Sequence, residues 1–156
     1  MIYVASSWRN ERYPAMIRRL LEANVEVYDF RNPVLGDNGF SWREIDPAWE
    51  SWTPEQFRNN LGHPTAKRGF AFDYAALNKA NAGLCMLPAG RSAHIEFGYL
   101  LGQGKPGCIL LAEGQEPELM YSMSTYIALN EMHAVNWCRK VQAMALDDVR
   151  REWSVH

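Results

Sequence analysis

The chain has 156 residues, of which 16 are Lys or Arg and 18 are Asp or Glu, so its formal net charge is −2. This length suffices for one compact domain that buries roughly 70% of the surface its unfolded chain would expose. The balanced charge excludes a general electrostatic attraction to nucleic acid. We expect no signal peptide, and no apolar run approaches the roughly 20 residues of a membrane span. The sequence therefore predicts a protein that binds neither nucleic acid nor a membrane.

Three cysteines, Cys85, Cys108 and Cys138, lie far apart and form no C-x-x-C pair. This usage is typical of reduced core residues in a cytoplasmic protein. The histidines are His63, His94, His133 and His156. Because these histidines lack a metal-ligand spacing such as H-E-x-x-H, we expect no metal ion. We also expect no cofactor.

The first thirty residues predict a β-α-β unit. Residues 1–5 are an apolar strand, and residues 13–21 have the apolar spacing of a helix, which ends near Asn24. Residues 25–30 alternate apolar with polar side chains, as in a second strand.

Residues 31–64 have no sustained periodicity and contain several Gly, Pro and aromatic residues. A capping-box pattern at residues 53–56 predicts a short helix from Pro54 to about Asn60. Because a loop this long is usually a functional lid or binding loop, we interpret residues 31–64 as an insertion in a single domain, residues 1–156.

Strand and helix patterns alternate again in the second half. Helices are predicted at residues 65–80, around Glu96 through about Gly102, at 116–121, and after a capping Asn130; strands are predicted at 83–87, 108–111 and 125–129. The expected buried stripe of the last helix is Met132, Val135, Cys138, Val141 and Ala145, and a frayed end is expected after about Arg150. Five strands alternating with helices predict an α/β fold with a mostly parallel sheet covered on both faces.

Residues 87–99 hold the strongest functional signal, because a strand-like run opens into a turn and then a helix that carries Glu96. A carboxylate near the start of such a helix lies at the carboxyl edge of the sheet, where open α/β folds bind ligands. The alternative is an ordinary solvated glutamate. Small and apolar neighbours such as Ala93 and Phe97 favour a functional role, because poor solvation makes a carboxylate more basic.

The turn Gly90-Arg91-Ser92 precedes this helix. Its backbone N–H groups and Ser92 could hold a phosphate. Alternatively Ser92 caps the helix, and both roles are compatible. The turn has no full G-x-G-x-x-G or Walker pattern, so it is a weak signal by itself.

The end of the first strand carries Trp8, whose ring can stack on a base. Ser6, Ser7, Arg9 and Asn10 surround it with hydrogen-bond donors. A core role for the tryptophan is the alternative.

Asp73 lies among Phe70, Phe72 and Tyr74, which offer a carboxylate little polar company. It is either an ordinary surface acid or a functional group. His94 is equally ambiguous between a surface residue and a catalyst.

The chain resembles the nucleoside 2-deoxyribosyltransferase-like family, a flavodoxin-like group that includes 2′-deoxynucleoside 5′-monophosphate N-glycosidases. The resemblance spans most of the chain and is most specific around Glu96. The matching pieces are the strand at residues 2–5, Phe-Ala-Phe-Asp at 70–73, Ser-Ala-His-Ile-Glu-Phe-Gly-Tyr at 92–99, and Gly-Gln-Gly-Lys-Pro at 102–106.

The resemblance implies a flavodoxin-like three-layer sandwich that acts on the N-glycosidic bond of a nucleoside or nucleotide. Glu96 takes the position of the family's nucleophile, which attacks the anomeric carbon. Tyr3 would orient Glu96, and Asp73 would contact the base and protonate it as it leaves. Glu118 and Met120 fall in the segment through which family members reach a neighbouring subunit, so a homodimer or higher homo-oligomer is expected.

Two positions depart from the transferases that exchange free nucleosides. Those enzymes usually carry an aspartate at the position of Gly90 and an asparagine at the position of Glu118. Arg91 and Ser92 instead suit a hydrolase that holds a 5′-phosphate. Two alternatives stay open: a nicotinamide-dinucleotide glycohydrolase, and a nucleotide-binding module without chemistry.

Overall fold

The computed structural model describes residues 1–144. The chain divides into two compact units: Met1–Asp29 together with the described part of Leu77–His156, here called the sheet unit, and Phe30–Ala76, here called the insert unit. The insert unit is longer than the insertion expected at residues 31–64, because it also includes most of helix α3 (Pro64–Lys79). No helix within residues 1–144 is long and apolar enough to cross a membrane.

The sheet unit contains one five-stranded sheet in the order β2-β1-β3-β4-β5, with every neighbouring pair parallel. The strands are β1 (Ile2–Ala5), β2 (Val27–Tyr28), β3 (Ala82–Met86), β4 (Gly107–Leu110) and β5 (Tyr126–Ala128). The predicted α/β class with a five-stranded parallel sheet is confirmed. This strand order is flavodoxin-like, with its topological switch point between β1 and β3.

Strand β2 is shorter than the predicted residues 25–30. The backbone N–H of Val25 donates to Leu20 at 2.9 Å in the turn after α1 (Tyr13–Glu22), so Val25 is not available to the ladder. Asp29, beyond the strand, accepts a 2.9 Å hydrogen bond from the Tyr13 hydroxyl. Both ends of the predicted strand are therefore bonded to α1 or to the turn that follows it.

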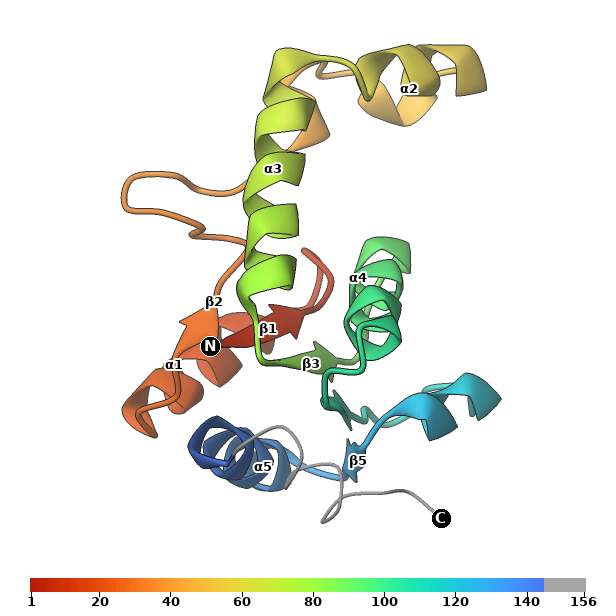
Figure 1. The fold of residues 1–156 in the computed structure, drawn as a ribbon. Helices are drawn as coiled ribbons and strands as arrows, with labels where there is room; N and C mark the ends of the chain where they lie inside the picture. Colours follow the sequence, from red (N-terminus) through yellow and green to blue (C-terminus); the bar gives the residue numbers. More distant parts are fainter. Residues whose placement is uncertain (145–156) are drawn as a thin grey trace. The chain divides into compact units, whose positions relative to one another are not determined.

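Helices cover both faces of the sheet (Figure 1). On one face, α1 and α5 (Glu131–Ala143) pack against each other, and Arg12 and Arg19 both pair with Glu131 at 3.0 and 3.2 Å. Helix α4 (Arg91–Gly102) covers the other face. The result is the expected three-layer arrangement.

Helix α4 approaches the sheet closely at two glycines. A Cβ atom on Gly83 would lie 2.7 Å from Leu100 Cδ1, and one on Gly107 would lie 2.7 Å from both Leu101 Cδ2 and Phe97 Cζ. A larger residue at either strand position would have to displace these side chains, because α4 packs closely over β3 and β4.

Helix α5 begins as predicted, because the Asn130 side chain accepts a 2.9 Å hydrogen bond from the His133 N–H. Its expected buried stripe was partly wrong: Met132 is 66% exposed, and Val135 is only half-buried. The buried residues are Ala134, Trp137, Cys138 and Val141. They repeat at the three- and four-residue spacing of a helix face, and Met132 falls outside it. Ala145 and the end after Arg150 lie outside the described residues.

The short helix predicted at 116–121 is a 3₁₀ helix, η3, at Leu119–Met123. Glu118 is its N-cap, and the Glu118 carboxylate accepts a hydrogen bond from the Met120 N–H at 3.1 Å. The helix cannot begin earlier because its cap is at residue 118.

The insert unit contains η1 (Trp42–Glu44), η2 (Trp49–Ser51), α2 (Pro54–Asn60) and α3 up to Ala76. Helix α2 has the predicted bounds and the predicted Thr53–Gln56 capping box. A second capping box, between Ser41 and Glu44, starts η1 and was not predicted.

An aromatic cluster takes the place of a sheet in the insert unit. The Trp42 ring lies edge-on to Phe40, Trp52 and Phe57, with centroid distances of 4.8, 5.6 and 5.7 Å. Trp52 Nε1 donates a 2.7 Å hydrogen bond to Asp46 Oδ2, which together with the Ala48 N–H lowers the pKa of Asp46. This cluster connects η1 to the residue that follows η2 and to α2.

Candidate functional site

The loops after β1 and β3 are joined at the switch point. Ser6 Oγ donates to the Met86 carbonyl at 2.9 Å, and Asn10 Nδ2 donates to Ser6 Oγ at 3.0 Å and to the Pro88 carbonyl at 3.3 Å. Ser6 and Asn10 are buried. Their polar groups therefore hold the carboxyl ends of the two strands together, which is a structural role for Ser6 beside the expected ligand contact.

Glu96 is the sixth residue of α4 and is half-buried. Its charge reaches Cys85, near the end of β3: burial first, and the negative charge of Glu96 second, raise the pKa of Cys85 to about 12. Glu96 therefore lies close enough to Cys85 for its charge to be felt there. Its position at the carboxyl edge of the sheet stays a prediction.

Tyr3 lies on the same face of the sheet as α4. It pairs in register with Gly83, as Ala5 pairs with Cys85, and residues in register on parallel strands point to the same side. Because α4 packs directly on Gly83, Tyr3 shares that face. Its ring is fully buried and stacks on Tyr28 at 5.2 Å. The structure thus brings Tyr3, Cys85 and Glu96 to one side of the sheet.

The turn before α4 presents open backbone. Gly90 is the N-cap, no side chain caps the helix, and Gly90, Arg91 and Ser92 are exposed. The interpretation of Ser92 as the cap is therefore wrong, because the helix begins one residue before it. The N–H groups of a first turn have no partners within the helix and can bind an anion.

His94 connects α4 to η3. Its Nδ1 lies 2.8 Å from the Gly90 carbonyl and its Nε2 lies 2.9 Å from the Tyr121 hydroxyl, and the two rings stack at 5.9 Å. Because a carbonyl can only accept, Nδ1 carries a proton and donates to Gly90, and Nε2 shares the second hydrogen bond with the Tyr121 hydroxyl. Burial, with the charges of Cys85 and Glu118, raises the pKa of Tyr121. Nothing in the sequence indicates the contact between His94 and Tyr121.

The remaining predicted residues of the sheet unit are on its surface. Trp8 is 51% exposed and Arg9 is exposed, directly after β1. Met120 is 60% exposed, and the Glu118 carboxylate is bonded within η3. These side chains are accessible to a ligand, but no described contact assigns them one.

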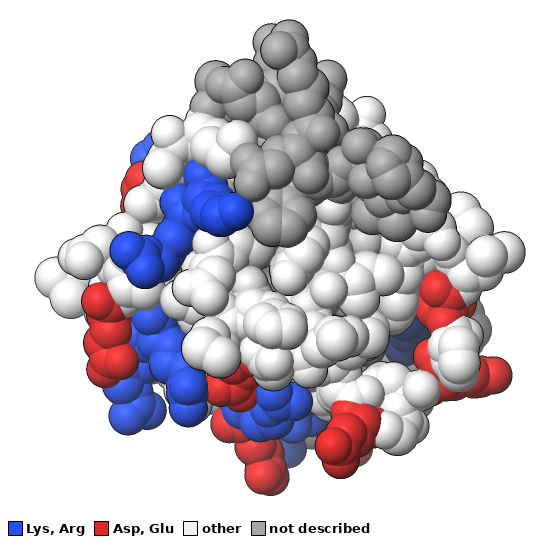
Figure 2. All heavy atoms as spheres, turned by 90° about the horizontal axis from the view of Figure 1, so that it is seen from below, with Lys and Arg blue, Asp and Glu red and all other residues white. Residues whose placement is uncertain are grey.

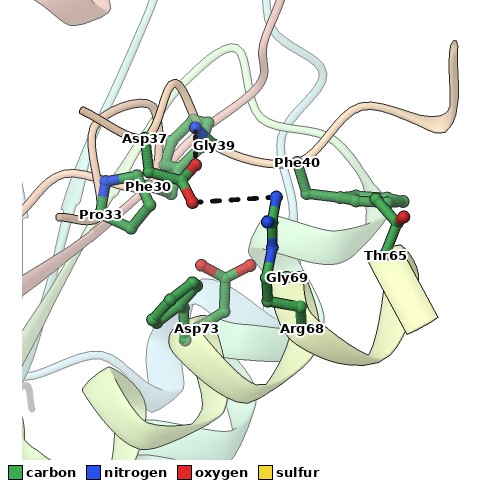
Figure 3. Close-up of a pocket in the computed structure, with 10 residues that line it drawn as sticks. Phe30, Pro33, Asp37, Gly39, Phe40, Thr65, Arg68, Gly69 and Asp73 are labelled. Atoms are coloured by element: carbon green, nitrogen blue, oxygen red, sulfur yellow. Dashed lines mark hydrogen bonds and ion pairs between the residues drawn. The ribbon is translucent and has the colours of Figure 1, made fainter. Parts of the chain in front are cut away.

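Asp73 lies in the insert unit, where it lines a pocket (Figure 3). The lining combines aromatic rings and small residues with four polar side chains: Phe30, Pro33, Asp37, Gly39, Phe40, Thr65, Arg68, Gly69, Phe72 and Asp73. Except for Asp73 and Phe72, which were noted as neighbours, the sequence did not indicate this set, because it joins the loop after β2 to the first turns of α3.

Two further observations concern metal binding and the distribution of surface charge. Within residues 1–144 no group of three or more His, Cys, Asp or Glu side chains is placed to hold a metal ion. On the face drawn in Figure 2, basic and acidic side chains are interspersed around a broad area that has neither.

The fold is a doubly wound, flavodoxin-like α/β fold, and α4, the helix that follows β3, carries the half-buried carboxylate of Glu96. No family model matches the chain, and no curated protein matches it. Among solved structures, it is similar to the Clostridium botulinum CMP N-glycosidase BcmB, with 16% identity over 87% of this chain and 96% of that chain, and a TM-score of 0.47. A likeness of this size carries no argument about activity, so the functional argument rests on the residues.

Proposed function

We propose that this protein cleaves the N-glycosidic bond of a nucleoside or nucleotide with Glu96 as the nucleophile. The observation that supports this most directly is that Glu96 is a half-buried carboxylate on α4, the helix that follows β3, and that its negative charge contributes to the raised pKa of the buried Cys85 thiol. A carboxylate at such a site is less solvated than a surface glutamate and is available to attack a bound substrate.

The reaction has two steps. A Glu96 carboxylate oxygen bonds to the anomeric carbon while the bond from that carbon to the base nitrogen breaks, and its electron pair leaves with the base, which takes up a proton. Water then bonds to the anomeric carbon and releases Glu96 as a carboxylate, while the water's proton replaces the one that left with the base. An acceptor base in place of water gives transfer instead of hydrolysis.

Tyr3 and Asp73 are the proposed partners of Glu96. Tyr3 orients the nucleophile, a role supported by its place on the α4 face of the sheet. Asp73 contacts the base and supplies its proton, a role supported by its place in the lining of a pocket.

The exposed turn of Gly90, Arg91 and Ser92 is the proposed site for a 5′-phosphate, because it joins backbone N–H groups to a guanidinium and a hydroxyl. The other proposed substrate contacts are Ser6, Trp8, Arg9, His94, Glu118 and Met120.

We also propose that the protein forms a homo-oligomer, as the family resemblance implies, and that it is located in the cytoplasm, as the cysteine usage implies.

The test is incubation with nucleosides, 5′-nucleotides including CMP, and nicotinamide dinucleotide, with and without an acceptor base, followed by chromatography of free base. Glu96→Ala should release base at least about 10³-fold more slowly than the parent, because the covalent step is lost. The matched control is Glu22→Ala, an exposed glutamate of α1, which should keep the parent's rate. Base release that survives Glu96→Ala would refute the proposed nucleophile.

The second candidate is a nucleotide-binding module without chemistry. One observation that favours it is that Gly90 and Glu118 stand where the transferases of the family it resembles carry polar catalytic partners. Another is that the Glu118 carboxylate accepts a hydrogen bond from the Met120 N–H. A thermal shift with one nucleotide but no base release from any substrate would support this candidate.

A further inference from the structure

Tyr121 and His94 connect η3 to α4, the helix that carries Glu96. The Tyr121 hydroxyl lies 2.9 Å from His94 Nε2, and the two rings stack at an interplanar angle of 11°. His94 Nδ1 lies 2.8 Å from the Gly90 carbonyl. Both ring nitrogens of His94 are thus bonded within the protein, so this side chain acts on its surroundings through Gly90 and Tyr121.

His94 closes the start of α4, which has no side-chain cap. The Gly90 carbonyl accepts the backbone N–H of His94 at 3.2 Å in addition to the bond from Nδ1. The first turn of a helix lacks some of its backbone partners, and helix ends fray. Two bonds from one residue to the N-cap carbonyl therefore stabilise the first turn of α4.

Tyr121 is itself held firmly on η3. Its carbonyl accepts from the N–H and from the hydroxyl of the buried Ser124, at 3.0 and 2.7 Å. Its half-buried ring packs against a cluster of four buried side chains: Cys85, Leu87, Phe97 and Ile109. The hydroxyl that meets His94 therefore belongs to a side chain fixed at both its backbone and its ring.

This contact lies close to Glu96 along α4. His94 and Phe97 are three residues apart, which makes them neighbours on the helix surface, and Glu96 lies between them in sequence. Cys85 responds to both sides of the contact. After burial, the charge of Glu96 raises the pKa of Cys85, and the charge of Cys85 in turn raises the pKa of Tyr121. Tyr121 therefore holds the part of α4 that carries Glu96.

We propose that Tyr121 and His94 are positioning residues for Glu96. Tyr121 fixes the His94 ring, His94 fixes the Gly90 carbonyl and the first turn of α4, and this turn sets where the Glu96 carboxylate stands relative to a bound substrate. A displacement of about 1 Å at a reacting group can cost roughly 10²-fold in rate. The inference rests on the proposed function, in which Glu96 is the nucleophile, and adds the residues that orient its helix.

The test compares base release by Tyr121→Phe, His94→Phe and the double variant, since both changes keep a flat ring and remove hydrogen bonds. Tyr121→Phe should lower kcat about tenfold and leave KM within about twofold, because the substrate still binds while the nucleophile is displaced. His94→Phe also loses the bond to Gly90 and should lower kcat further. Because Tyr121 acts through His94, Tyr121→Phe should have no effect in the His94→Phe background.

The matched control is Tyr99→Phe, toward the other end of α4. The Tyr99 hydroxyl donates to Asn78 Oδ1 at 3.0 Å, so this variant also loses one tyrosine hydrogen bond on the same helix. It should lose a similar amount of stability in urea but keep the parent's kcat. Equal losses of kcat in Tyr121→Phe and Tyr99→Phe, or additive losses in the double variant, would indicate a merely structural role and overturn the inference.

Amide hydrogen exchange tests the positioning without turnover. The N–H groups of residues 94–97 should exchange about tenfold faster in Tyr121→Phe than in the parent, and at the parent's rate in Tyr99→Phe. Unchanged exchange in Tyr121→Phe, or an unchanged kcat, contradicts the inference. Faster exchange in a protein whose parent releases no base contradicts the proposed function alone. If circular dichroism shows that His94→Phe is unfolded, His94→Leu removes the same two side-chain bonds and takes its place.

Discussion

The carboxyl edge of the sheet unit and the pocket of the insert unit are built in different ways. At the sheet edge, ladder hydrogen bonds and close helix packing on Gly83 and Gly107 hold the backbone. In the insert unit, capping side chains and half-buried aromatic rings hold the backbone. A residue change should therefore cost more stability in the sheet unit, whereas in the insert unit it should mainly alter the pocket.

The largest expected difference is between two apolar truncations. Leu100 is fully buried against β3, so Leu100→Ala should lower the free energy of unfolding by about 2–5 kcal/mol. Phe57 contacts Trp42 but is 47% exposed, so Phe57→Ala should cost about 1 kcal/mol or less. Urea denaturation measures both. Equal losses would show that the aromatic cluster is as important for stability as the core.

A sharper comparison uses two glycines with the same close contact. Gly107→Ala forces a Cβ to 2.7 Å from two side chains in the core, and should cost about 1–3 kcal/mol. Gly69→Ala meets Phe40 Cβ at the same 2.7 Å, so the backbone that carries Phe40 must move and not the ring alone; because Phe40 is only half-buried, about 1 kcal/mol is expected. Gly90→Ala, which meets nothing within 4 Å, is the comparison without a clash; it should cost only the preference of an N-cap for glycine over alanine, less than Gly107→Ala, in the same urea experiment.

The smallest effect is a change in pH dependence within the insert unit. The hydrogen bond from Trp52 lowers the pKa of Asp46 below 3.8, so this carboxylate stabilises the fold above pH 3.8 and the contribution is lost as the pH falls through the lowered pKa. In an NMR titration, Trp52→Phe should raise the pKa of Asp46 toward 3.8. Trp49→Phe is the control, because the Trp49 side chain makes no such bond to Asp46. An unchanged pKa in Trp52→Phe would contradict this account.

Local patterns predicted most elements. The Thr53–Gln56 capping box and the Asn130 cap correctly placed the starts of α2 and α5, because capping depends on residues within one turn. The same reasoning overextended β2 and included Met132 in the core. Both errors concern which residues meet a neighbour, and that depends on partners distant in sequence.

The residues of the candidate site also fall into those that the sequence predicted and those that depend on partners distant in sequence. Glu96, Tyr3 and Asp73 were selected from local surroundings and from a family resemblance. The His94–Tyr121 contact and the Asp37–Arg68 pair were not, since each joins residues 27 or 31 positions apart (121 − 94 and 68 − 37). No periodicity links such positions.

The sequence by itself determined the alternation of strands and helices, the parallel sheet and the helix that carries Glu96, because apolar spacing and caps act over a few residues. Only the tertiary structure decided that Tyr3 and Cys85 share the α4 face, that Ser6 joins two strand ends, and that Asp73 lines a pocket with Arg68. These relations depend on strand register and on packing between segments that are distant in sequence. Such contacts form only when the chain folds, so no local pattern predicts them.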